Sequence, residues 1–210
     1  MMSGTFESRQ SAPEAKPTDA GQSVIGAIAS ARSVQGAWAA TPLADRLAVI
    51  RRFRRLAADR ADRLAASVTA PWRGDPAETL AAEIIPLADA CRYLERQAPR
   101  LLRPRKLGRR GRPAWLTGVH TEIRRDPLGV VLVIGPSNYP LMLPGIQAIQ
   151  ALAAGNAVVI KPGRMGRPAA LAIADLLQEA GLPPEALQVL DESIEAARTA
   201  MDAGVDKIVF

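Results

Sequence analysis

The apolar residues of the first hundred positions recur with the period of an α-helix. Between residues 22 and 40 they fall every three or four positions, at Val24, Ile28, Ala31, Val34 and Trp38. This spacing puts them on one face and predicts a helix with a buried stripe. Thr41 and Pro42 follow as a capping residue and a proline at the first helical position, so a second helix is expected from Pro42 to about residue 70.

A third helix is predicted to begin after Asp75 and to run to about residue 101. Asp75 is a favourable N-cap, Pro76 suits the first helical position, and Glu78 completes a capping box. Pro86 lies inside this helix and should kink it between residues 82 and 85. The expected apolar stripe consists of Leu80, Ile84, Leu87, Cys91, Leu94, Ala98 and Leu101. The thiol on this stripe is therefore predicted to be a small buried hydrophobe.

Two short segments separate the helices from the second half of the chain. Residues 103–113 read RPRKLGRRGRP and are expected to form an irregular basic loop. Residues 114–125 contain β-branched residues in rough alternation, which predicts one or two short edge strands with His120 on the surface. Such edge strands are candidates for pairing between subunits.

The pattern changes after Asp126, where continuous apolar runs begin to alternate with helical periods. The run from residue 128 to 134, LGVVLVI, is typical of a strand buried on both faces. Further strands are expected at 157–161, 187–191 and 207–210, with helices at 141–154, 169–180 and 193–202. Strands and helices that alternate at this spacing predict parallel strands with right-handed crossovers, which is a doubly wound α/β sheet.

Composition excludes several classes of protein. The chain has 210 residues, 48% of them hydrophobic, with 16 glycines and 17 prolines spread along it and no apolar run near twenty residues. Collagen-like and membrane-spanning proteins are therefore excluded. The first twenty residues lack the apolar stretch of a signal peptide, so a cytoplasmic protein is expected. The predicted organisation is a disordered tail (1–21), a helical region (22–103), a basic loop with edge strands (104–125) and an α/β region (126–210).

The net charge of +6 comes from one segment. Nine basic residues lie between Arg92 and Arg112 with a single acid, Glu95, and the rest of the chain is slightly acidic. No aromatic residue lies between Leu94 and Pro113 to stack on a base, so a nucleic-acid partner is not expected. An arginine-rich surface for another protein remains an alternative.

The chain contains one cysteine and one histidine, Cys91 and His120. An internal disulfide is therefore impossible, and these two residues cannot form a metal site of recognisable spacing. We expect no bound metal.

Candidate chemistry lies in the loops after the first two predicted strands, because ligands of such sheets bind outside the carboxyl ends of the strands. No G-x-G-x-x-G fingerprint follows the first strand. The loops instead carry Asn138, whose carboxamide can donate to a developing oxyanion, and Lys161, whose ammonium suits phosphate or ribose oxygens. Taken alone, Asn138 could equally be a turn residue and Lys161 a solvated strand end.

The two loops together are more specific. The stretches DPLGVVLVIGPSNYPL and ALAAGNAVVIKPG resemble the aldehyde dehydrogenase superfamily, in which a strand, an Asn-aromatic-Pro turn, a helix and a strand ending in Lys-Pro follow one another. The stretch AWAATPLADRLAVIRRFRRLAADRADRLAASV resembles that family's N-terminal helical hairpin, and DKIVF resembles the strand before its next glycine turn. The resemblance covers the chain from about residue 22 onward. It implies N-terminal helices followed by a Rossmann-like sheet that is incomplete at the C-terminus.

The resemblance also implies roles for individual residues. Asn138 would be the side-chain half of an oxyanion hole for the tetrahedral thiohemiacetal. Lys161 would contact the adenosine ribose hydroxyls or a 2′-phosphate. The remaining cofactor contacts would come from Ile134, Gly135, Pro136, Ser137, Gly163 and Arg164.

Two positions depart from the family's common pattern. Ser137 stands where many members have tryptophan, on the nicotinamide side of the site. Arg164 stands where NAD-preferring members often place a ribose-binding glutamate. A guanidinium cannot accept hydrogen bonds from ribose hydroxyls but can pair with a 2′-phosphate, so NADP is favoured over NAD as cofactor.

The implied function is an NAD(P)-dependent oxidation of aldehydes by an enzyme that is homo-oligomeric when full length. The family's nucleophilic cysteine and general-base glutamate lie downstream of the strand that DKIVF resembles, so the 210 residues are expected to be an inactive N-terminal fragment. Relatives that reduce acyl-CoA or acyl phosphates remain an alternative, and so does a non-catalytic nucleotide-binding role.

Overall fold

The computed structural model describes residues 19–69, 75–108, 113–116 and 118–210. Its first element is α1 (Asp19–Ala40), so residues 19–21 form the first turn of a helix. The rest of the predicted tail lies outside the described residues. The apolar stripe of α1 is largely confirmed, because Val24, Ile28, Ala31 and Trp38 are buried and Val34 is half-buried.

A four-stranded parallel sheet forms the centre of the molecule. Its spatial order is β5-β4-β3-β6. The strands are β3 (Val130–Ile134), β4 (Ala157–Lys161), β5 (Leu187–Val189) and β6 (Lys207–Val209). From β3 the chain adds β4 and β5 on one side and then β6 on the other, so the direction in which strands are added reverses at β3. This arrangement confirms the predicted doubly wound α/β fold.

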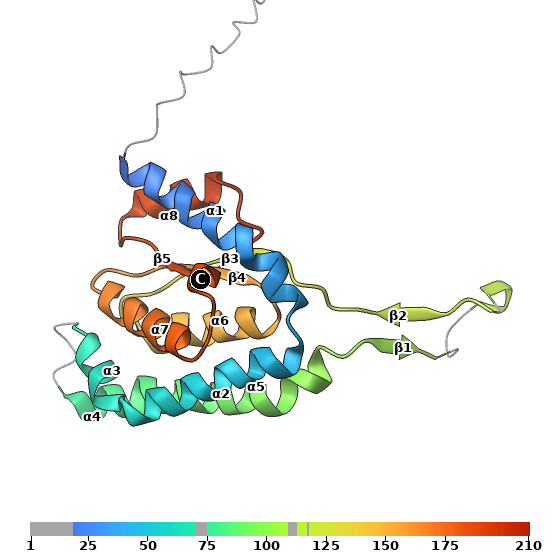
Figure 1. The fold of residues 1–210 in the computed structure, drawn as a ribbon, viewed down its shortest axis with the longest axis horizontal. Helices are drawn as coiled ribbons and strands as arrows, with labels where there is room; N and C mark the ends of the chain where they lie inside the picture. The colour runs from blue at the N-terminus through green and yellow to red at the C-terminus, as the bar shows by residue number, and fades with distance from the viewer. Residues whose placement is uncertain (1–18, 70–74, 109–112, 117) are drawn as a thin grey trace, which may run out of the picture.

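Helices cover both faces of this sheet. Figure 1 shows α6 and α7 on one face and α1 and α8 on the other. The crossover helices are α6 (Met142–Ala153), α7 (Arg167–Glu179) and α8 (Ile194–Asp202), and a short 3₁₀ turn, η3 (Pro184–Ala186), precedes β5. Alternate strand residues divide between two cores: Val131 and Val133 face α6 and α7, whereas Val130 and Leu132 face α1 and α8. Every residue from Val130 to Val133 is buried, as the continuous apolar run predicts.

The N-terminal helices form a further layer below α6 and α7 (Figure 1). They are α2 (Leu43–Asp59), α3 (Ala61–Ser67), α4 (Pro76–Thr79), the π-helical turn η1 (Leu80–Ile84) and α5 (Ile85–Leu101). Their buried faces join α6, α7 and one face of the sheet in a single apolar core. The predicted break before Pro86 is confirmed. It takes the form of the π-helical turn η1, which ends at Ile84, directly before α5 begins.

Three local expectations about these helices were wrong. Thr41 does not cap α2, because its hydroxyl donates to the Ala37 carbonyl and so ends α1 instead. The second helix is not continuous but breaks at Arg60 into α2 and α3. Leu80 and Leu101, at the two ends of the predicted apolar stripe, are exposed, whereas the stripe residues between them are buried.

The basic segment also differs from the prediction. Part of the expected irregular loop forms β1 (Arg105–Leu107), which pairs antiparallel with β2 (Thr121–Ile123), and η2 (Ala114–Leu116) lies between them. Figure 1 shows this two-stranded ribbon extending away from the body of the molecule. The edge strand at β2 and the exposed position of His120 are confirmed. Within the described residues, no helix has the length and apolarity needed to cross a bilayer.

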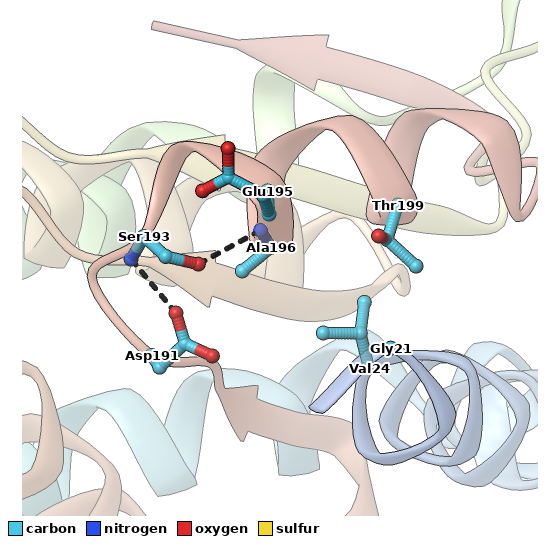
Figure 2. Close-up of a pocket in the computed structure, with 7 residues that line it drawn as sticks. All are labelled: Gly21, Val24, Asp191, Ser193, Glu195, Ala196 and Thr199. Carbon is cyan, nitrogen blue, oxygen red and sulfur yellow. Dashed lines mark hydrogen bonds between the residues drawn. The ribbon is translucent and has the colours of Figure 1, made fainter. Parts of the chain in front are cut away.

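Helix α8 begins at a polar turn that follows β5. The Ser193 hydroxyl accepts a hydrogen bond from the Ala196 amide at 3.0 Å, and Asp191 Oδ1 accepts one from the Ser193 amide at 2.7 Å (Figure 2). Hydrogen bonds from Ser193, with smaller contributions from the charges of Lys161 and Arg167, lower the pKa of Asp191. The turn therefore carries a fixed negative charge at the carboxyl edge of the sheet.

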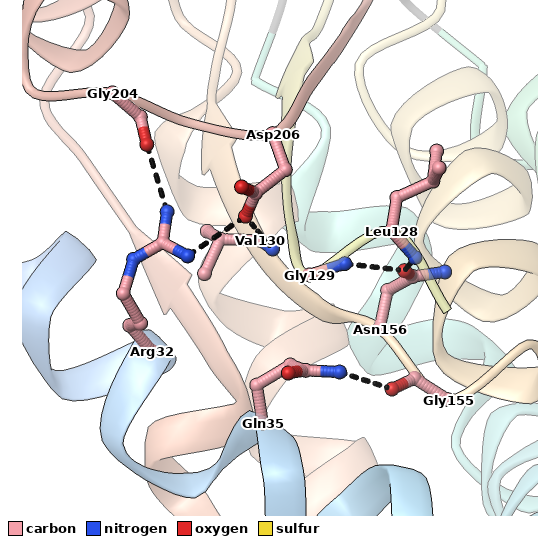
Figure 3. A network of polar contacts seen from close by, with 9 residues as sticks. All are labelled: Arg32, Gln35, Leu128, Gly129, Val130, Gly155, Asn156, Gly204 and Asp206. Atoms are coloured by element: carbon pink, nitrogen blue, oxygen red, sulfur yellow. Dashed lines mark hydrogen bonds and ion pairs between the residues drawn. The ribbon is translucent and has the colours of Figure 1, made fainter. Parts of the chain in front are cut away.

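A second polar network fastens the amino ends of the strands (Figure 3). Asn156 Oδ1 accepts hydrogen bonds from the amides of Leu128 and Gly129, at 2.6 and 3.1 Å, while its Nδ2 donates to the Ala151 carbonyl. Asp206 accepts the Val130 amide at 2.7 Å and pairs with Arg32 of α1 at 2.9 Å. These bonds join α1, β3, β4 and β6 at one end of the sheet.

We expect Asn156→Ala to destabilise the fold by about 1–3 kcal/mol, because Asn156 is 5% exposed and the amides of Leu128 and Gly129 would lose the oxygen that accepts their hydrogen bonds. Urea unfolding followed by circular dichroism measures this. The matched control is Gln188→Ala, which also removes a side-chain amide. The hydrogen bond from Gln188 to the Pro184 carbonyl is exposed, so its loss should lower the stability by less than about 0.5 kcal/mol. Equal midpoints for the two variants would contradict the prediction.

Candidate functional site

The register between β3 and β4 brings the two candidate loops to one level. Ile134 at the end of β3 pairs with Lys161 at the end of β4, and the Gly135 amide continues the ladder by donating to the Lys161 carbonyl at 2.9 Å. Both loops therefore leave the carboxyl edge of the sheet side by side. Ile134 is half-buried and Gly135 is buried.

The backbones of these loops touch at Gly163. A Cβ built on Gly163 would lie 2.5 Å from the carbonyl carbon of Pro136 and 2.7 Å from the Ser137 nitrogen. No side chain fits there, so Gly163 lets the two loops approach more closely than any other residue would. Of the predicted cofactor-binding residues, this contact joins Pro136, Ser137 and Gly163 directly.

Asn138 follows on the same loop and is exposed. The start of α6, three residues later, is bonded to a buried acid that sequence analysis missed. This acid is Glu83 of the π-helical turn η1. One oxygen of this fully buried carboxylate accepts the amides of Leu141 and Met142, at 2.8 and 3.0 Å. The positive end of α6 and these donors stabilise the carboxylate. The signal was present, because Glu83 shares the apolar face of its helix with Ile84 and Leu87, where an unexplained acid needs a partner.

The basic side chains at the end of β4 and in the turn that follows it suit an anionic ligand. Lys161 is 8% exposed and lies close enough to Asp191 for its charge to help lower the pKa of that acid. Arg164, in the turn between β4 and α7, and Arg167, the first residue of α7, are exposed. Ammonium and guanidinium groups around a backbone cradle match the phosphate and ribose oxygens of a nucleotide. Lys161, Arg164 and Arg167 are therefore the candidate contacts for a nucleotide at this edge.

Glu192 is the second acid that sequence analysis missed. It follows β5, yet its two oxygens accept the amides of Met165, in the turn after β4, and of Arg167, at the start of α7, at 2.8 and 2.9 Å. The turn is thus held by a residue of the next strand–helix unit. No motif marks Glu192, because an acid after a strand also suits a solvated loop.

Two hollows lie between α1 and the end of β5. The smaller, of about 40 Å³, is lined by the start of α8 and the first turns of α1 (Figure 2). The larger, of about 330 Å³, is lined by Arg167, Gln188 and Asp191 opposite Ser23 and Ser30 of α1. Among the described residues, no group of histidine, cysteine, aspartate and glutamate side chains could hold a metal ion.

Cys91 lies away from these loops, inside the packed helical layer. Its side chain is fully buried between α5 and its neighbours, and burial raises the pKa of the thiol to about 12. A thiol with so high a pKa carries almost no thiolate near neutral pH and is a poor nucleophile.

We expect Cys91 to resist alkylation by iodoacetamide at pH 8 in the folded chain and to react readily in urea. Because burial raises the pKa of the Cys91 thiol to about 12, a change of pH from 7 to 9 should add little reactive thiolate to the folded state. Mass spectrometry of the labelled chain measures the modified fraction. Rapid labelling of the folded chain at pH 8 would show that the thiol is accessible and would contradict the prediction.

We expect Gly163→Ala to destabilise the chain by about 1–3 kcal/mol, because the new methyl group would meet the Pro136 backbone. Gly36→Ala is the matched control, since nothing lies within 4 Å of a Cβ at this exposed position of α1. Alanine there should be neutral or slightly stabilising. Thermal unfolding of both variants tests the pair, and a Gly163→Ala variant as stable as the parent would refute the close approach.

Comparison with known proteins supplies independent findings. The model of the aldehyde dehydrogenase family matches residues 10–210. A provisionally named NADP(+) succinate-semialdehyde dehydrogenase of Mycolicibacterium smegmatis is 37% identical over 195 residues, which is 92% of this chain and 37% of that protein. A second such protein, of Mycobacterium tuberculosis, is 36% identical over 200 residues and 36% of its own length is covered. The chain thus spans little more than a third of these relatives.

Solved structures agree on the fold. A provisionally named aldehyde dehydrogenase from Burkholderia cenocepacia superposes with a TM-score of 0.80 at 27% identity, covering 91% of this chain and 38% of that one. Methylmalonate-semialdehyde dehydrogenase (DddC) from Oceanimonas doudoroffii superposes with a TM-score of 0.75 at 26% identity, covering 90% of this chain and 42% of that one.

Proposed function

The chain belongs to the aldehyde dehydrogenase family, and we propose that it holds the NAD(P) cofactor and part of the oxyanion hole of an aldehyde-oxidising enzyme. The observation that carries this proposal is the contact between the two strand-end loops at Gly163, which gathers backbone donors, Asn138 and Lys161 at one edge of the sheet. When bound, NAD(P)⁺ supplies the hydride acceptor.

The residues at this edge of the sheet have different proposed roles. Lys161, fixed at the end of β4, donates to the oxygens of the adenosine ribose or of its 2′-phosphate. The backbone of Ile134, Gly135, Pro136 and Ser137 lines the cofactor. Asn138 donates its carboxamide hydrogens to the oxygen that becomes negative as the aldehyde carbon turns tetrahedral, a contribution of about 3 kcal/mol for a single donor.

NADP is the proposed cofactor. Arg164 is exposed beside Gly163 and presents a guanidinium, which pairs with a phosphate but cannot accept from ribose hydroxyls. The two mycobacterial relatives carry NADP(+) in their names, which supports the same choice. Their names also include a semialdehyde, so aldehydes are the proposed substrate class.

Cys91 is not the nucleophile in this proposal, because it is buried and its thiol stays protonated. The 210 residues alone should therefore not oxidise aldehydes through a cysteine. Homo-oligomerisation, the lack of a nucleic-acid partner and a cytoplasmic location stay predictions from the sequence.

We expect Arg164→Glu to weaken binding of 2′,5′-ADP by at least about tenfold while changing binding of 5′-AMP little, because only the first nucleotide carries the 2′-phosphate. Isothermal titration calorimetry with both nucleotides measures the ratio. Arg198→Glu, an exposed arginine of α8, is the control for the change in net charge. A parent chain that binds neither nucleotide would refute the proposed cofactor site, and an unchanged ratio in Arg164→Glu would refute the role of Arg164.

A further inference from the structure

The turn that carries Arg164 is fixed at both sides of this residue. On one side, Gly163 is wedged against the Pro136 backbone. On the other, Met165 has a φ of 61°, in the left-handed region that side-chain-bearing residues seldom adopt. Among the described residues, it is the one non-glycine with positive φ. A strained residue of this kind persists only where its surroundings hold it in place.

The carboxylate of Glu192 provides that hold. Its Oε2 accepts the amide of Met165 itself at 2.8 Å, and its Oε1 accepts the amide of Arg167, the first residue of α7, at 2.9 Å. The turn is closed internally by the Gly166 amide, which donates to the Gly163 carbonyl at 2.9 Å. Two charge-assisted bonds from one side chain thus bracket the strained residue and the helix start.

Arg164 depends on this backbone for its direction. Its exposed side chain makes no hydrogen bond or ion pair with another described residue, so no neighbouring side chain aims it. A guanidinium selects a phosphate by the geometry of its donors, which requires that its Cα and Cβ be fixed. A turn that relaxes at Met165 would therefore spread the guanidinium over many positions.

We propose that Glu192 is a positioning residue for cofactor selection: by holding the Met165 turn, it keeps Arg164 where it can pair with a 2′-phosphate. This inference rests on the proposed function, since it assumes that the cofactor lies along this edge. A purely electrostatic role predicts the opposite effect, because a carboxylate near a phosphate repels it and its removal would strengthen binding.

The test compares Glu192→Ala and Glu192→Gln with the parent 210-residue chain. Amide hydrogen exchange without nucleotide reports on the turn, and calorimetry with 2′,5′-ADP and 5′-AMP reports on selection. In Glu192→Ala we expect exchange at Met165 and Arg167 to be about tenfold faster or more. The affinity ratio between the two nucleotides should fall about tenfold. Glu192→Gln keeps one acceptor oxygen and should fall between the parent and Glu192→Ala.

Glu185→Ala is the control, because it removes an exposed carboxylate at the amino end of β5 and leaves the turn intact. Unchanged exchange in Glu192→Ala would overturn the inference, and so would a 2′,5′-ADP preference that is retained or increased. A parent chain that binds both nucleotides equally would overturn the assignment of Arg164 in the proposed function, and the inference with it. The two failures are therefore distinguishable.

Discussion

The parallel register between β3 and β4 is the constraint on which the candidate site depends. Because Ile134 pairs with Lys161, the strands end together, and the Gly135 amide still finds the Lys161 carbonyl one step beyond the ladder. A shift of one residue would reverse the direction of every side chain in β4 and would move Lys161 away from its present neighbours. The buried residues on both faces of these strands prevent such a shift, since each face packs in its own core.

Remote carboxylates then fix the loops that the register brings together. Glu83 reaches from the helical layer to the start of α6, Glu192 reaches from the end of β5 to the start of α7, and Asp206 accepts the first amide of β3. All three accept backbone N–H groups, which would otherwise lack partners at the ends of helices and strands. Each carboxylate comes from an element distant in sequence. The loops therefore have their present shape only when the whole fold has formed.

Strand and helix positions in the second half followed from apolar patterning because each element has one period over its whole length. The run at β4 matches the structure at both ends, and β3 lies within its predicted range. The close approach of the backbone at Gly163 and the hydrogen bonds of Glu83 and Glu192 could not be predicted, because they join residues 25 to 59 positions apart. Spacing along the chain carries no information on such contacts. Strand β1 was missed for a similar reason, because only its pairing with the predicted edge strand β2 makes this basic stretch a strand.

The two cations of the candidate site differ in how they are held, and this difference bears on their proposed roles. Lys161 is part of β4, is almost fully buried, and faces a fixed negative charge at Asp191, so its position follows from the sheet. An ammonium there interacts with a ribose hydroxyl or a phosphate oxygen alike and distinguishes them weakly. Arg164 has the donor geometry that does distinguish them, but it lies on a strained turn outside the sheet. If the proposed roles hold, the binding of a nucleotide depends on the sheet, whereas the choice between two nucleotides depends on the turn that Glu192 holds.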